Sequence, residues 1–324
     1  MRTSRLCAVS PVKTPEFETT DRSNSDSAVF SLISKPQLPV QLLLTPPRDT
    51  WFSMINAYLD ESGIHNGAEI CVVAGYFGGP SQFKKLALAW RRVLAKHGVA
   101  LNDFHTTDMA KTRRYQPMLL ELTQTIGEYK ISPISFGIVV ADFNSYNERQ
   151  RKFITGATLD EKTGKFLSTG CPNKPYFVPF QLCLKRVTAY APIGGKANFF
   201  FGSDRPVAGY ARSLFDQIKM QVRQGSWPGT TWKEKNRLGN SDFPLAKQTP
   251  ELQAADLYCF LTYQHMLERH KAHDWDVRPS GLLANCLKNM RSAEDHAYQN
   301  KRCIDEMLEE TRRISGFDWD AVSA

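Results

Sequence analysis

The stretch INAYLDESGIH, residues 55–65, decides the fold class that the sequence predicts. It begins as an apolar strand and then places Asp60 and Glu61 side by side, where we expect the strand to end. A loop that contains Asn66 and Gly67 leads into a second apolar strand, ICVVAGYFG. Two apolar runs joined by a loop with an Asn-Gly pair predict a β-hairpin.

Downstream of the hairpin, helical and strand patterns alternate, which is typical of an α/β domain. The apolar residues of SQFKKLALAWRRVLAKHG recur at helical spacing and predict a helix there. Thr249 as N-cap and Pro250 at the first helical position open a long helix that contains LQAAD. Further helices are expected at about 115–128, 177–190 and 206–224, and strands in ISPISFGIVVAD and KANFFFGSD.

Composition divides the 324 residues into three parts. Residues 1–50 are rich in Ser, Thr and Pro and predict a flexible extension. We expect the folded domain over residues 51–275, with a polar, Gly-rich insertion near residues 155–175. Residues 276–324 look helical, and we expect them to pack on the domain as a C-terminal extension.

Several protein classes do not fit the sequence. No apolar run reaches the roughly 20 residues that span a bilayer, and residues 1–10 lack the apolar segment of a secretory signal. The seven cysteines are scattered and none is in CxxC spacing, which argues against a disulfide framework and a zinc site. We therefore expect a cytoplasmic protein without a membrane partner; the sequence indicates no oligomeric state.

A net charge of +8 favours a polyanionic partner such as nucleic acid. In SWPGTTWKEKNR, Trp232 and Lys233 belong to a mixture of aromatic and basic residues that suits stacking on bases and neutralising phosphates. Anchoring of this loop to the core explains the aromatic residues equally well. The basic residues of the first long helix fit a solvated face as well as a binding surface; they are Lys84, Lys85, Arg91, Arg92 and Lys96.

Three acids lie where a strand ends or where a helix packs on a sheet. Asp60 follows the first strand, Asp204 follows a central strand, and Asp256 shares a helix face with apolar residues. An ionised carboxylate in such a place costs on the order of several kcal/mol unless it is paired or bound to a cation. Converging carboxylates suit hard cations such as Mg²⁺ or Mn²⁺, and two such ions can promote phosphodiester hydrolysis.

Each acid also has a structural explanation. DESG is ordinary turn chemistry, in which Asp and Ser bond to local backbone and Gly adopts a positive φ. Asp204 can cap the following helix or pair with Arg205, and Asp256 can form a buried salt bridge. Glu61 is a weaker candidate than Asp60, because neighbouring residues of a strand face opposite ways unless the strand has already turned.

The loop FHTTD adds His105 and Asp108. His105 is a candidate to contact a scissile phosphate or to help move a proton, and a loop histidine satisfied by its neighbours is an equally good explanation. The glycines of GYFGG lack a dinucleotide or P-loop pattern. No GxSxG elbow is present, so nucleophilic serine chemistry is not indicated.

The motifs YLDESGIH, FHTTD, FFFGSDR and LQAADLYCF, in this order, resemble the domain-of-unknown-function 3800 family. The resemblance covers roughly residues 54–270, and the pairing of DESG with LQAAD is its most specific part. It implies a ribonuclease H-like fold, in which a mixed central sheet starts with a β-hairpin and continues with strands alternating with helices. Helices would flank this sheet.

The resemblance also implies roles for the residues that match the family's motifs. Asp60, Asp204 and Asp256 would be the metal ligands, from the first strand, the central strand and the helix. Glu61 would be a further acid of the site, and His105 matches the family's loop histidine, which has no settled role.

We therefore expect a divalent-metal-dependent phosphodiester hydrolase that acts on RNA or DNA, with Mg²⁺ or Mn²⁺ as cofactor and room for a two-ion site. The candidate substrate contacts are Gln253, Arg205, Trp232 and Lys233. Two alternatives stay open. One is a non-catalytic module that binds nucleic acid or another partner on the same fold, and the other is a metal-dependent hydrolase of a small nucleotide.

Overall fold

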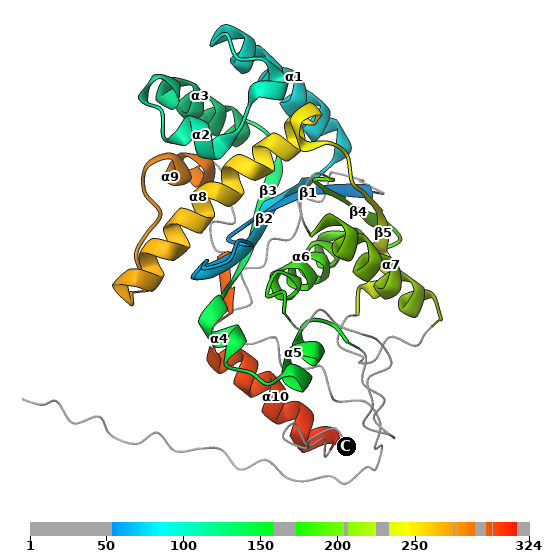
Figure 1. Cartoon of the computed structure of the whole chain (residues 1–324). Helices are drawn as coiled ribbons and strands as arrows, with labels where there is room; N and C mark the ends of the chain where they lie inside the picture. The colour runs from blue at the N-terminus through cyan, green and yellow to red at the C-terminus, as the bar shows by residue number, and fades with distance from the viewer. Residues whose placement is uncertain are drawn as a thin grey trace, which may run out of the picture.

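The computed structural model describes residues 54–157, 173–203, 207–224, 233–274, 276–288, 296–299 and 301–315. The predicted N-terminal extension, most of the predicted insertion and the predicted site residues Asp204, Arg205 and Trp232 lie outside these ranges. Within them, the chain forms one sheet with helices on both faces, so the predicted α/β class is confirmed (Figure 1).

A mixed sheet of six strands, in the order β5-β4-β1-β2-β3-β6, forms the centre of the described part. The strands are β1 (Met54–Ser62), β2 (Ile70–Gly78), β3 (Ile131–Val139), β4 (Lys196–Phe201), β5 (Leu238–Asp242) and β6 (His296–Gln299). β1, β2 and β3 are antiparallel, whereas β4 runs parallel to β1, β5 parallel to β4 and β6 parallel to β3. The carboxyl ends of β1, β4 and β5 therefore lie at the same end of the sheet.

The first hairpin is longer than the sequence predicts. β1 does not end at Asp60 but continues to Ser62, and its last residues pair with β2. Gly63 then turns the chain with a φ of 76°, and a Cβ atom at this position would lie 1.9 Å from the carbonyl oxygen of Ile70. Both the backbone angle and the lack of space require glycine. Strand pairing, and not turn chemistry, thus sets the backbone of Asp60 and its neighbours.

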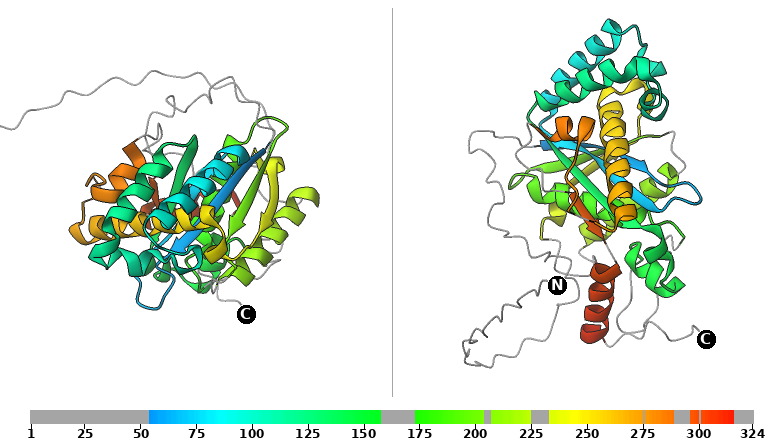
Figure 2. Two further views of the ribbon diagram at one scale, coloured as in Figure 1. Left: turned by 90° about the horizontal axis from the view of Figure 1, so that it is seen from above. Right: turned by 90° about the vertical axis from the view of Figure 1, so that its left-hand side faces the viewer.

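Helices cover both faces of the sheet (Figures 1 and 2). One face carries α1 (Pro80–Lys96), α2 (Thr106–Ala110), α3 (Gln116–Gly127), α8 (Pro250–Ala272) and α9 (Gly281–Lys288). The other face carries α6 (Phe177–Tyr190) and α7 (Ala208–Gln224), with α4 (Val140–Asn144), α5 (Glu148–Ile154) and α10 (Lys301–Ser315) packed beside them. The long helix α8 lies across β1 and β2.

Two apolar clusters fill the space between the sheet and its two helical layers. In β1, Ala57 and Leu59 belong to the cluster under α6, and Tyr58 belongs to the cluster under α8. This alternation follows from the period of two in a strand. In α1, all of the apolar residues that recur at helical spacing are buried, as predicted: Phe83, Leu86, Trp90, Val93 and Leu94.

The long helix α8 begins at Pro250, with Thr249 in the N-cap position, as the sequence predicts. The Thr249 hydroxyl does not cap the helix, however, because it donates to the backbone oxygen of Leu245 at 3.0 Å. Neither α8 nor any other helix of the described ranges is long and apolar enough to cross a bilayer.

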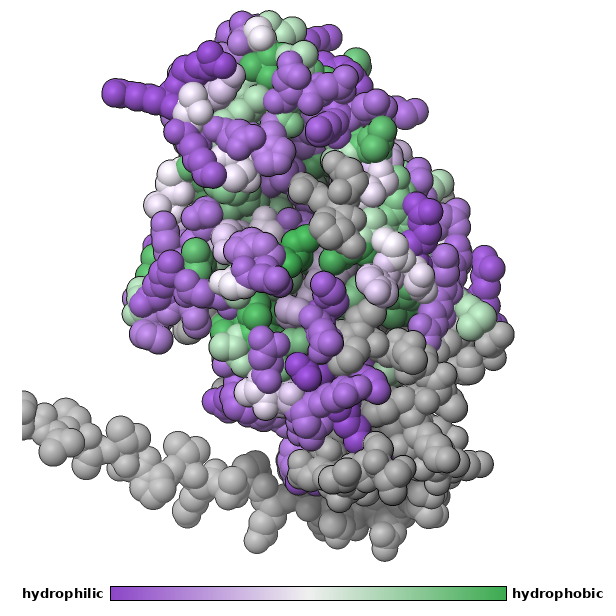
Figure 3. All heavy atoms as spheres, viewed as in Figure 1, coloured by the Kyte–Doolittle hydropathy of each residue, from purple (hydrophilic) through white to green (hydrophobic). Residues whose placement is uncertain are grey.

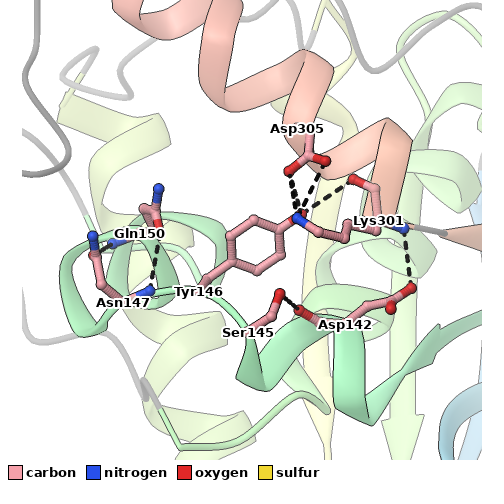
Figure 4. A network of polar contacts seen from close by, with 7 residues as sticks. All are labelled: Asp142, Ser145, Tyr146, Asn147, Gln150, Lys301 and Asp305. Atoms are coloured by element: carbon pink, nitrogen blue, oxygen red, sulfur yellow. Dashed lines mark hydrogen bonds and ion pairs between the residues drawn. The ribbon is translucent and has the colours of Figure 1, made fainter.

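The C-terminal residues are not only helical, since β6 extends the sheet beside β3. Helix α10 follows β6 and docks through a polar network (Figure 4). The Tyr146 hydroxyl donates its one proton to Asp305 at 2.8 Å, and the backbone oxygen of Lys301 is a second acceptor within reach at 3.1 Å. The backbone N–H of Lys301 donates to Asp142 at 3.2 Å, and Leu308 of α10 joins the core. In the described part, α10 is therefore held to the α4 end of the domain by both polar and apolar contacts.

Candidate functional site

Asp60 lies at the carboxyl end of the parallel strands β1 and β4. The two strands pair up to Leu59 and Phe201, so Asp60 is the first residue of β1 beyond the last pair. It follows Tyr58 by two residues, which places it on the face of the sheet that α8 covers. Its exposed fraction is only 3%. In open α/β sheets, ligands bind outside the carboxyl ends of the parallel strands.

Asp256 approaches the same region from α8. The backbone N–H of Thr106 donates to its Oδ2 atom at 3.4 Å. Thr106 is the first residue of α2, so the carboxylate accepts one of the N–H groups that a helix start leaves without an intrahelical partner. Asp256 is half-buried, whereas Asp60 is buried.

The thiol of Cys259 links the strand to the helix. Its Sγ atom donates to the backbone oxygen of Asp60 at 3.3 Å. Burial raises the pKa of this thiol well above its usual value, and the charges of Asp60, Glu61 and Asp256 raise it further, against a hydrogen bond from Ser62 that lowers it. The hydrogen bond to Asp60 thus places the helix with the LQAAD motif against the strand with the DESG motif.

Glu61 is directed to the other face of the sheet. Because β1 continues to Ser62, Asp60 and Glu61 still alternate as strand residues do. Burial is the largest cause that raises the pKa of Cys71 and of Tyr176, and the charge of Glu61 is the second largest. Both of these residues lie in the cluster under α6. The structure therefore separates Glu61 from Asp60 and does not support it as a further acid beside Asp256.

Two acids that the sequence analysis did not single out lie on the α8 face. Asp242 is the last residue of β5 and pairs with Phe200, and Glu251 lies in the first turn of α8. Burial, and then the charges of Glu251 and Asp242, raise the pKa of Tyr58 to about 12. The α8 face around Tyr58 therefore carries two further acids.

His105 lies beside the Asp256 contact. It is the N-cap residue of α2 and directly precedes Thr106. Its Nδ1 atom lies 3.5 Å from the Oδ2 atom of Asp108, and both side chains are exposed, at 52% and 79%. The FHTTD motif is thus next to the LQAAD helix, and the imidazole of His105 is accessible from solvent.

Gln253 has a structural role, which corrects the prediction that it contacts substrate. Its Oε1 atom accepts from the indole N–H of Trp90 at 2.9 Å. Its Nε2 atom donates to the backbone oxygens of Leu101 at 2.7 Å and Lys247 at 3.2 Å. Both N–H donors are therefore used, and the side chain is 3% exposed. Gln253 holds α8 to α1 and to the loops beside it.

Lys233 lies at the wrong end of the sheet for a substrate contact beside the acids. It precedes the short 3₁₀ helix Lys235–Arg237, which leads into the amino end of β5. Lys196, the first residue of β4, donates from Nζ to the backbone oxygen of Asn236 at 2.6 Å. Asp60 lies at the opposite end of β4, so the length of the strand separates the two positions.

Carboxylates suit hard divalent cations, and two of the three predicted ligands, Asp60 and Asp256, are described. Among the described residues, no group of three or more His, Cys, Asp or Glu side chains is arranged to hold a metal ion. Asp204, the third predicted ligand, lies outside the described ranges, as do Arg205 and Trp232. The carboxylates of Asp60 and Asp256 are thus suitable ligands for a divalent cation, but the described part of the chain does not contain the complete set of predicted ligands.

Sequence reasoning missed Thr106 and Cys259, the residues whose contacts join the motifs. A signal for each was present. Thr106 falls inside FHTTD. Cys259 follows Asp256 by three residues, so the side chains of Asp256 and Cys259 occupy the same face of the helix.

Comparison of the chain with protein-family models, with curated proteins and with solved structures finds no match in any of the three. Function is therefore inferred from the residues and their arrangement.

Proposed function

We propose that this protein is a divalent-metal-dependent phosphodiester hydrolase of ribonuclease H-like type that acts on RNA or DNA. One observation carries the proposal: Cys259, three residues after Asp256 in α8, donates to the backbone oxygen of Asp60 at 3.3 Å, although Asp60 and Asp256 are far apart in sequence. The helix that carries Asp256 thus packs on the strand that carries Asp60, at the carboxyl end of parallel strands, which supports a shared site because ligands bind there in α/β sheets.

The sheet supports the ribonuclease H-like part of the proposal. It starts with an antiparallel hairpin of β1 and β2, continues with β3, and then adds β4 parallel to β1 after a helical segment. Helices flank both faces. The nearness of DESG to LQAAD also supports kinship with the domain-of-unknown-function 3800 family, because these two motifs carry the resemblance.

Asp60 and Asp256 are the described residues that would hold Mg²⁺ or Mn²⁺, with Asp204 as the third candidate ligand. A bound ion would supply an activated water and stabilise the charge that develops on the phosphate oxygens. The protein's own contribution is to hold the carboxylates. The Thr106 N–H orients Asp256, and Cys259 ties the backbone of Asp60 to α8.

His105 is the group that we propose moves a proton in this site. Asp108 engages its Nδ1 atom, which leaves Nε2 as the nitrogen that can exchange a proton with a leaving oxygen. The imidazole is exposed and directly precedes Thr106, whose N–H contacts Asp256. Replacement of His105 by Gln should therefore lower the cleavage rate without abolishing metal binding.

Cleavage of labelled RNA and DNA in Mn²⁺ or Mg²⁺ tests the proposal. Asp60→Asn and Asp256→Asn should each abolish cleavage, because each removes a charged ligand while keeping the shape of the side chain. Asp103→Asn is the matched control, since Asp103 is an exposed acid at the end of the short 3₁₀ helix Leu101–Asp103, just before FHTTD. Normal cleavage by either site variant rejects the proposal, and turnover of mononucleotides without cleavage of polymers would indicate the small-nucleotide hydrolase instead.

A non-catalytic module that binds nucleic acid is the second candidate. The net charge of +8 and the exposed basic residues of α1, which has no acidic residue, favour it. Such a module would bind nucleic acid in a manner that depends on salt but not on Mg²⁺, and it would form no product in the cleavage assay.

A further inference from the structure

The turn between α2 and α3 presents three cations near Asp256. Lys111, Arg113 and Arg114 are exposed, and the segment from Lys111 to Tyr115 contains no acid. Within the described ranges, none of the three side chains forms an ion pair with a carboxylate. Their charges are therefore available to an anionic ligand. In Figure 3 the upper part of the molecule, over α1, α2 and α3, carries mainly hydrophilic side chains.

Hydrogen bonds hold this turn in one conformation. The Thr112 hydroxyl donates to the backbone oxygen of Asp108 at 3.0 Å. The Gln116 amide donates from Nε2 to the backbone oxygen of Ala110 at 2.9 Å, which ties the start of α3 to the end of α2. Met109 is buried beneath the turn. The basic residues are thus presented by a backbone that is anchored to the core, which lowers the entropy lost on binding.

The turn lies a short, defined distance from the acids. Thr106, at the start of α2, donates to Asp256, and Lys111 follows the end of the same five-residue helix. A helix rises about 1.5 Å per residue, so α2 separates the two points by about 8 Å. One strand of a B-form duplex advances about 3.4 Å per nucleotide. The basic turn therefore begins within a few nucleotides of a strand that reaches Asp256.

Arg114 adds a planar surface to the turn. Its guanidinium lies 4.5 Å from the centre of the Tyr115 ring, and it also donates to the Tyr115 hydroxyl. Stacking on the ring orders a side chain that would otherwise lose rotamer freedom on binding. Guanidinium groups bind phosphate in a bidentate manner, so an ordered arginine here is well suited to a backbone phosphate.

We propose that Lys111, Arg113 and Arg114 grip the phosphate backbone of a nucleic-acid strand and align it with Asp256. The direction of the strand, toward Asp256, rests on the function proposed above; the binding itself does not. The charge of the turn is complementary to a polyanion with closely spaced phosphates. These residues are positioning residues, since none of them touches the carboxylates.

The basic face of α1 is less well placed for this role. Trp90, on the buried side of α1, contacts Gln253 of α8, so the exposed Lys84, Lys85 and Arg92 lie on the side turned away from α8. This face provides a matched control, because replacing these three residues removes the same number of charges from a neighbouring helix.

Fluorescence anisotropy on the full-length protein tests the proposal. The probe is a labelled single strand of about 20 nucleotides, as RNA and as DNA of the same sequence, in EDTA and at several salt concentrations. We expect Lys111→Gln/Arg113→Gln/Arg114→Gln to lower the affinity by about tenfold or more at low salt. The slope of log affinity against log salt should fall by about 2, because each phosphate contact to a single strand contributes about 0.7.

The control variant Lys84→Gln/Lys85→Gln/Arg92→Gln should keep most of the wild-type slope of log affinity against log salt. Equal losses in both variants, no binding by the wild type, or equal affinity for a labelled polyglutamate would overturn the proposal. If the triple variant does not fold, Lys111→Gln/Arg113→Gln keeps the Arg114 stack and should lower the slope by about 1.4. Cleavage is measured separately. Binding of this kind without cleavage rejects only the proposed hydrolase function. Cleavage with equal binding by all variants rejects only the proposed binding role of Lys111, Arg113 and Arg114.

Discussion

The Sγ atom of Cys259 lies 3.3 Å from the backbone oxygen of Asp60 and donates a hydrogen bond to it. This contact fixes the helix that carries Asp256 against the strand that carries Asp60. It explains how two short motifs separated by most of the domain can belong to one site.

Cys259→Ala should lower both stability and metal affinity. The substitution removes a buried sulfur atom and its hydrogen bond, which costs about 1–2 kcal/mol of the free energy of unfolding. Loosening the Asp60 backbone should also weaken Mn²⁺ binding by about tenfold, as is typical for residues that hold metal ligands. Urea unfolding and calorimetric titration measure the two effects.

Cys183→Ala is the matched control for Cys259→Ala. Cys183 is also fully buried, on the opposite face of the sheet, and its Sγ atom lies 3.6 Å from the backbone oxygen of Val73. This variant should lose similar stability and keep its metal affinity. Equal metal affinities in the two cysteine variants would show that Cys259 does not position Asp60.

Gln253→Met should destabilise the fold without a direct effect on substrate binding. It leaves the indole N–H of Trp90 and the backbone oxygens of Leu101 and Lys247 without their partner. The oxygen of Leu101 still accepts from the N–H of Phe104 at 3.3 Å. The other two groups cost about 1–3 kcal/mol each when left unpaired, so a loss of about 2–6 kcal/mol is expected. A double-mutant cycle with Trp90→Phe measures the Trp90 part. If Gln253→Met keeps the wild-type stability and binds nucleic acid more weakly, Gln253 contacts substrate after all.

His265 should make the protein less stable as the pH falls. Its Nε2 atom is buried without a hydrogen-bond partner in the described part of the chain. Burial, and then the charge of Arg269, lower its pKa below the ordinary value of 6.5, against the effects of Glu268 and of a backbone contact at Val277. The unfolded chain therefore binds the proton more tightly, and stability is lost as the pH drops from 6.5 through the lower, folded pKa.

Thermal unfolding from pH 8 to pH 5 measures this effect. His265→Gln should become more stable relative to the wild type as the pH falls, since glutamine has no proton to gain. His65→Gln, which replaces an exposed histidine, is the control for the substitution itself. A constant difference between His265→Gln and the wild type across this range would contradict the prediction.

Much of the fold follows from local patterns. The helical spacing around Trp90 and the Pro250 start of α8 predict helices that the structure contains. The sequence patterns of these two helices extend over many residues, and packing against neighbouring elements favours the same helices. The end of β1 could not be predicted in this way, because pairing with β2 extends the strand past Asp60 and overrides the turn preference of its sequence. Strand β6 also depends on a distant partner, β3.

The candidate site was predictable in part for the same reason. Asp60 and Asp256 stand out because an acid at a strand end or a helix face is unusual, and the strand and the helix that carry them are joined through Cys259. The roles of Gln253 and Lys233 depend on which buried groups and which end of the sheet lie nearby. Only the three-dimensional arrangement reveals that Gln253 is fully hydrogen-bonded and that Lys233 lies at the other end of β4.

Calorimetric titration of Mn²⁺ into the wild type, Asp60→Asn, Asp256→Asn and the exposed control Asp103→Asn tests the central claim most directly. We predict that the wild type and Asp103→Asn bind Mn²⁺ with the same affinity, and that each of the two site variants loses binding while keeping its thermal stability. Equal Mn²⁺ binding by Asp60→Asn or Asp256→Asn and the wild type would contradict the claim that these two acids share a cation.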